Sequence, residues 1–96
     1  MMVTIGDSLT VAPDVMFRHL DNEAVLLDLK SGTYFGLNDV GARTWHLIVE
    51  RGSLARVLDV LVDEYDADRE VLERDLLALA GQLVARKLAN VTANAG

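Results

Sequence analysis

The chain has 96 residues, of which 51% are apolar and 25% are charged, a composition typical of one folded domain and not of a disordered segment. It contains no cysteine, which excludes disulfides, thiolate metal sites and cysteine nucleophiles. Its net charge is −6, and because nucleic acids bind clustered Lys and Arg, we expect no nucleic-acid partner.

The opening segment, residues 1–13, ends at the only proline and is predicted to be loosely structured because its apolar runs are short. No positive charge precedes an apolar block there, so we expect no secretory signal. Nowhere does the chain approach the roughly 20 apolar residues of a membrane span. The sequence therefore predicts a cytoplasmic protein without a membrane span.

One serine of this segment lies in the run Gly6-Asp7-Ser8-Leu9, which matches the nucleophile block of one esterase family. Such a serine needs a histidine that activates it, on an α/β scaffold that does not fit into this length. Asp7-Ser8-Leu9 also resembles the serine motif of acyl carrier proteins, but there the serine opens a helix. We interpret the run as a turn and expect no catalytic residue.

Three short runs that follow are predicted to form β-strands. They contain β-branched, aromatic and aliphatic residues, and tight turns separate them. The predicted strands are Met16–Leu20, Ala24–Leu29 and Thr33–Leu37. Because short connections join neighbouring strands, we expect an antiparallel meander.

The apolar spacing then changes to that of helices. A first helix is predicted from about Asp39 to Glu50, capped by Asn38 and ending near Gly52. Ser53 is predicted to cap a second helix.

The third and longest helix is predicted to begin after a cap at Asp66 or Asp68 and to reach Leu88. Its apolar residues cover a wider arc than one helix contact needs. They form two lines, Leu72, Leu76, Leu79 and Leu83 on one and Leu77, Ala80 and Val84 on the other.

Three strands followed by three helices belong to the α+β class. We expect one domain over residues 14–88 and a small, polar tail, 89–96, that frays. The same elements describe a winged helix, a fold used on DNA, but residues 68–88 balance four acids with four bases. DNA binding is therefore a remote alternative.

Two further groups of side chains are candidates for metal or acid–base chemistry. His19 and His46 lie on different predicted elements without an HxxxH partner, so we expect no metal site. Asp63, Glu64 and Asp66 are interpreted as the solvated end of the second helix. We expect no cofactor.

The predicted third strand, Thr33–Leu37, has the composition of an edge that accepts another strand, because it contains no proline and no lysine. Beside it, the third helix offers surplus apolar surface. An open strand edge and an apolar helix face together capture an extended peptide by strand addition. The alternative is that Tyr34, Phe35 and the leucines are ordinary core residues.

Between residues 23 and 48 the chain contains Leu-Leu-Asp-Leu, then Ser-Gly-Thr-Tyr-Phe-Gly-Leu-Asn, then Gly-Ala-Arg-Thr-Trp. These runs resemble the PqqD-like family, small domains that recognise precursor peptides of ribosomally made, modified natural products (RiPPs). Val57–Tyr65 and Leu72–Leu83 resemble the family's second and third helices, so that the likeness covers roughly residues 14–88.

The resemblance implies a winged helix-turn-helix-like domain without catalysis of its own. The leader part of a precursor peptide would add as a fourth strand beside the third strand, against the third helix. Carried over by position, the leader-binding residues would be Thr33, Tyr34, Phe35 and Gly36 on the edge and Leu72, Asp75, Leu76, Leu79 and Leu83 on the helix.

As a free-standing chain with the Tyr-Phe-Gly-Leu-Asn run, it is most similar to the leader-binding component of lasso peptide systems. The implied partners are a precursor leader peptide, a transglutaminase-like leader peptidase and an asparagine-synthetase-like cyclase. The alternative is a PqqD-type peptide chaperone that serves a radical enzyme in the synthesis of pyrroloquinoline quinone or another RiPP.

Overall fold

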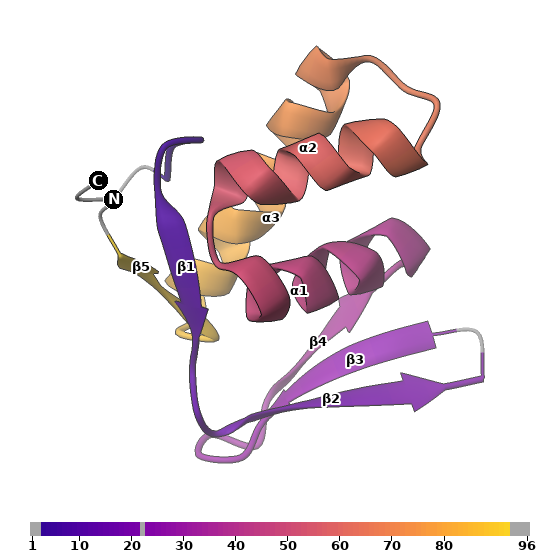
Figure 1. Cartoon of the computed structure of the whole chain (residues 1–96). Coiled ribbons are helices and arrows are strands. Elements are labelled where there is room, and N and C mark those ends of the chain that lie inside the picture. The colour runs from indigo at the N-terminus through magenta and orange to yellow at the C-terminus, as the bar shows by residue number, and fades with distance from the viewer. Residues whose placement is uncertain (1–2, 22, 93–96) are drawn as a thin grey trace.

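The predicted strands form one antiparallel sheet in the order β2 (Val15–Leu20), β3 (Glu23–Asp28) and β4 (Tyr34–Leu37). The computed structural model describes residues 3–21 and 23–92. All three helices lie on one side of this sheet (Figure 1). This arrangement confirms the α+β class and the antiparallel meander.

The register of the sheet places alternate residues on opposite faces. The inner face packs against the helices, whereas the outer face is not covered by a helix in Figure 1. The inner cross-strand rows are Phe17–Leu26–Phe35 and His19–Ala24–Leu37, and the outer rows are Met16–Leu27–Tyr34 and Arg18–Val25–Gly36.

The helices are α1 (Asp39–Arg51), α2 (Leu54–Glu64) and α3 (Arg69–Ala85). The side chains of Asn38 and Ser53 each accept a hydrogen bond from a first-turn N–H, which confirms both predicted caps. Every helix contributes fully buried side chains to the core between the helices and the sheet. The largest buried side chains are Leu26, Leu47, Ile48, Leu54, Leu58, Leu61, Leu83 and Val57.

Helix α3 ends at Ala85, three residues before the predicted end. Lys87 adopts a left-handed conformation with φ of 62°, its N–H donates to the Val84 carbonyl, and the Leu88 N–H donates to the Leu83 carbonyl. These two bonds make a Schellman motif, in which glycine usually occupies the left-handed position. Because a lysine occupies it here, the sequence carries no glycine signal for the helix end.

Two strands from the ends of the chain pair with each other, β1 (Ser8–Val11) with β5 (Ala89–Thr92). Leu9 and Ala89 are buried between them and the helices. The Leu9 N–H also donates to the Gly52 carbonyl at 2.9 Å, which ties β1 to the α1–α2 connection. The two strands therefore complete one side of the core.

The prediction of a loosely structured segment over 1–13 and a frayed tail over 89–96 is wrong where β1 and β5 pair. Residues 1–2 and 93–96 lie outside the described residues. Each of the two strands has only four residues, and its partner lies at the far end of the sequence. No hairpin turn marks such a pair, and so local patterns did not predict it.

Candidate functional site

Among the residues that the structure describes, strand β4 pairs with β3 on one side and has no strand partner on its other edge. The Asp28 N–H donates to the Thr33 carbonyl at 2.9 Å, which identifies this cross-strand pair as a hydrogen-bonded one. Hydrogen-bonded and non-bonded pairs alternate along an antiparallel ladder. It follows that Tyr34 and Gly36 direct their backbone N–H and C=O groups away from the sheet. These groups can pair with another strand.

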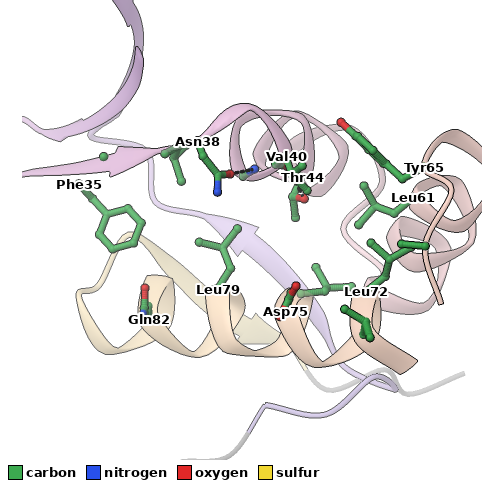
Figure 2. A pocket seen from close by; sticks show the side chains of 16 residues that line it. Phe35, Asn38, Val40, Thr44, Leu61, Tyr65, Leu72, Asp75, Leu79 and Gln82 are labelled. Atoms are coloured by element: carbon green, nitrogen blue, oxygen red, sulfur yellow. Dashed lines mark hydrogen bonds between the residues drawn. The ribbon is translucent and has the colours of Figure 1, made fainter. Parts of the chain in front are cut away.

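A groove of about 470 Å³ lies between β4 and α3. Figure 2 shows Phe35 extending from β4 towards α3, and Leu79 extending from α3 towards the opposite wall. The first turn of α1 continues the wall begun by β4, and the end of α2 closes one end. The lining residues are Phe35, Gly36, Leu37, Asn38, Val40, Gly41, Thr44, Leu61, Tyr65, Ala67, Val71, Leu72, Asp75, Leu76, Leu79 and Gln82.

Two polar side-chain oxygens on the α1 side of the groove already have partners inside the protein. The buried Thr44 hydroxyl donates to the Val40 carbonyl at 2.7 Å, and Asn38 Oδ1 accepts from the Gly41 N–H at 2.7 Å. Asp75 on α3 is the only ionisable acid or base among the lining residues apart from the Tyr65 phenol. The groove therefore suits apolar side chains more than charged ones.

One end of the groove is bounded by a contact between α3 and β4. The Arg86 guanidinium carbon lies 5.1 Å from the centre of the Phe35 ring, within the range of a cation–π interaction. Arg86 is the residue that caps α3. The contact thus fixes the Phe35 ring relative to the helix.

At the other end, an ion pair joins α1 to the end of α2. Arg43 Nε donates to Glu64 Oε1 at 2.9 Å and Arg43 Nη2 donates to Glu64 Oε2 at 2.6 Å. This bidentate hydrogen bond lowers the pKa of Glu64 and raises the pKa of Arg43. The next residue, Tyr65, lines the groove, so the pair positions this part of the wall.

The structure brings together six of the nine residues predicted to bind a leader peptide. The residues that line the groove are Phe35, Gly36, Leu72, Asp75, Leu76 and Leu79. Thr33 precedes β4, and its hydroxyl lies 2.7 Å from the Ser31 hydroxyl in the turn. Tyr34 is on the outer face and is 73% exposed, whereas Leu83 is fully buried in the core.

Sequence reasoning missed the contribution of α1 and α2 to the walls. Val40 and Gly41 belong to the first turn of α1, and Leu61 and Tyr65 lie at the end of α2. A signal for the first pair was present, because Asn38 alone separates β4 from α1. With so short a connection, the first turn of α1 must continue the line of the strand.

The other sequence candidates lie outside the groove. Ser8 belongs to β1 and bridges to Ser53, and both His19 and His46 are exposed on the sheet and on α1. The His46 ring packs edge-on against Phe17 at 4.5 Å. Within residues 3–21 and 23–92, no cluster of three or more His, Asp or Glu side chains could hold a metal ion. None of the helices described has the length and apolar character needed to cross a membrane.

Comparisons with known proteins agree with this geometry. The family described as Coenzyme PQQ synthesis protein D (PqqD) matches residues 23–89. A solved structure of TbiB1 in complex with the TbiA(beta) leader peptide is 38% identical, with a TM-score of 0.78, over 88% of this chain and 99% of that chain.

A second solved structure, a lasso peptide synthetase B1 complexed with the leader peptide, is 32% identical, with a TM-score of 0.77. The alignment covers 86% of this chain and 98% of that chain. Comparison with curated protein sequences gave no significant match. The two structural neighbours are thus similar over nearly their whole length, and both were solved with a leader peptide bound.

Proposed function

The chain belongs to the PqqD family, and from this premise we propose that it captures the leader region of a ribosomal precursor peptide as an added β-strand. One observation carries the proposal: the outward backbone groups of β4 lie beside an apolar groove formed by α3 and α1. Strand addition needs both features, because main-chain bonds give affinity and side-chain pockets give selectivity.

Binding would proceed in two parts that the geometry keeps separate. The guest backbone would bond to Tyr34 and Gly36, while alternate guest side chains enter the groove above Leu76 and Leu79. A fully buried leucine-sized side chain contributes about 1.5–3 kcal/mol. The ordering of the guest opposes this gain, whereas β4 is already held in place by its pairing with β3 and by the buried Leu37.

We further propose that the chain acts without catalysis and delivers the leader to a leader peptidase of lasso peptide biosynthesis. Both structural neighbours carry a bound leader peptide, and one is described as a lasso peptide synthetase component, which supports this pathway. The transglutaminase-like peptidase is the proposed direct partner, and an asparagine-synthetase-like cyclase is a further one. The second candidate is a peptide chaperone for a radical enzyme, which the description of the matching family favours.

The test uses candidate precursor peptides from the open reading frames beside the gene for this chain, each divided into a leader and a core part. We expect the labelled leader to bind in fluorescence anisotropy and the core to remain free. In NMR spectra the leader should shift the amide signals of Tyr34 and Gly36 more than those of β2. Binding that leaves the β4 amides unchanged would contradict strand addition.

Delivery is tested with the peptidase and the radical enzyme in parallel. We expect the chain to accelerate cleavage of the precursor by the peptidase and to leave the radical enzyme unaffected. The reverse result would favour the second candidate. Turnover of the peptide by the isolated chain would overturn the non-catalytic proposal.

A further inference from the structure

Gly36 lies on the outer face of the edge strand, where the fold itself gives no reason for a glycine. Its φ is outside the left-handed region, and a Cβ built on it would meet no other heavy atom within 4 Å. Glycine in a strand weakens the strand because it adds flexibility and buries no side chain. The missing side chain therefore leaves room that no described residue of this chain occupies.

On the Tyr34 side of this position the outer face is apolar, whereas Arg18 lies in its own row and Glu23 beside it. Val25 pairs with Gly36 in the register, and Tyr34 lies two residues earlier on the same face. The next cross-strand row, Met16–Leu27–Tyr34, is apolar across the whole sheet, and Met16 and Tyr34 are exposed. A shallow hollow of about 380 Å³ at the end of β4 is lined by Glu23, Gly36, Leu37 and Asn38.

An added strand would place its side chains alternately on the two faces of the extended sheet. Guest residues in line with Phe35 and Leu37 would enter the groove, because these two residues face inward. The guest residue between them would pair with Gly36 and lie on the outer face. Diagonal neighbours across two strands are about 7–8 Å apart, within reach of an aromatic side chain. This residue would therefore lie close to Tyr34.

Resting on the proposed function, we propose that the outer face holds a second subsite, which takes a large aromatic residue of the leader. Its ring would cover Gly36 and contact Val25 and Tyr34, as cross-strand aromatic residues do when they cover a glycine in a sheet. A cationic guest residue would find Glu23 at one side of the hollow, but Arg18 lies in the same cross-strand row and would repel it. An aromatic ring can instead pack on Val25 and Tyr34. The leader is thus recognised on both faces of its strand.

The test begins with a random-sequence peptide library displayed on phage and selected on the wild-type chain. We expect enriched peptides with two apolar residues separated by one position, and an aromatic residue at that intermediate position. Replacing this aromatic residue by alanine should weaken binding about two- to fivefold, the range of a cross-strand aromatic contact. An intermediate position without preference would overturn the subsite and leave the groove intact.

The Gly36→Val variant provides the second readout. A Cβ at this position meets no neighbour, and valine favours strands, so the fold and its Tm should be retained. The added side chain should prevent a guest ring from lying across the strand, so the preference for an aromatic residue should be lost while the apolar pair is retained. Arg18→Val, in the same cross-strand row but on β2, is the matched control and should keep the preference.

The outcomes separate the two proposals. If Gly36→Val and wild type select the same intermediate residue, the subsite is overturned and the groove stands. If wild type enriches no peptide, or if its peptides bind equally well to a Leu79→Asp variant of the groove, the proposed function fails and the subsite fails with it.

Discussion

Over residues 3–21 and 23–92, both outer strands of the sheet, β2 and β4, have one edge without a strand partner, and the two edges differ in what lies beside them. The alternation that exposes backbone groups on β4 applies to β2 as well. The Leu29 N–H donates to the Asp14 carbonyl at 2.9 Å, which places the outward groups of β2 on Phe17 and His19 among others. Both edges therefore offer outward backbone groups to an added strand, although the Val15 N–H of β2 already donates to the Ala12 carbonyl.

The groove lies along β4 and includes no residue of β2. On β2, Arg18 and His19 are exposed, and the Phe17 ring is taken up by its contact with His46. A single hydrogen bond exchanged with water contributes only about 0.5–1.5 kcal/mol. Selective capture therefore depends on the side-chain groove, and an open edge alone does not define a binding site.

The largest expected effect comes from a charge placed in the groove. Leu79→Asp should weaken leader binding by roughly 100-fold or more, because it removes an apolar contact and brings a carboxylate into an apolar site. Leu79 is only partly buried, whereas Leu76 is 2% exposed, so the same change at Leu76 would test folding instead. Anisotropy titrations measure the affinity.

The control is Val49→Asp, since Val49 is an exposed apolar residue of α1 outside the groove. It should retain wild-type affinity, and thermal melts of both variants should show that they remain folded. An equal loss of binding in both variants would mean that the added negative charge weakens binding wherever it is placed. The groove would then not be the reason why the leader binds at β4 and not at β2.

Proline substitutions compare the two edges directly. Tyr34→Pro removes an outward N–H from β4 and should weaken binding about tenfold, whereas His19→Pro removes one from β2 and should not. Tyr34→Ala keeps the backbone donor and separates the loss of the ring from the loss of the N–H. Phe35→Pro would break the ladder with β3, so it does not test the edge. Similar losses of leader affinity for Tyr34→Pro and His19→Pro would contradict the proposal that the leader pairs with β4 and not with β2.

Local patterns predicted most of what forms the β4 side. The three strands begin and end within one residue of their predicted limits, and both Asn38 and Ser53 cap helices as expected. The turn between Asp28 and Thr33 is held by the Asp28 side chain, which accepts from the Lys30 N–H and the Ser31 hydroxyl. These features are set by residues that are close in sequence, and so local sequence patterns predict them.

The direction in which an individual side chain points, into the groove, into the core or into solvent, could not be predicted in the same way. Tyr34 and Phe35 are adjacent aromatic residues, and only the register with β3 decides that Phe35 enters the groove. On α3, Leu79 lines the groove while Leu83, one turn later on the same line, is fully buried beside Leu88. Leu83 belongs to the same buried core as Leu88 and Ala89, which follow the end of the helix, so its burial depends on tertiary packing.

The smallest expected effect concerns the Arg43–Glu64 ion pair. Removing it should loosen the end of the groove formed by α1 and α2 without altering the edge of β4 or of β2. Glu64→Gln should lower Tm slightly at neutral pH and reduce leader affinity only a little, because both side chains are partly exposed. Asp63→Asn is the matched control, because Asp63 makes no ion pair within the described residues, and it should change neither quantity.

The pH dependence identifies the cause of that effect. The hydrogen bond from Arg43 lowers the pKa of Glu64 in the folded state, so the pair stabilises the fold above the ordinary glutamate range of about pH 4.3. Its contribution is lost as the pH falls through the lowered pKa, because protonation of Glu64 then removes the negative charge. Melting curves of wild type and Glu64→Gln should therefore converge on acidification. A difference in Tm that persists at the acid end would show that packing, and not the ion pair, holds this wall of the groove.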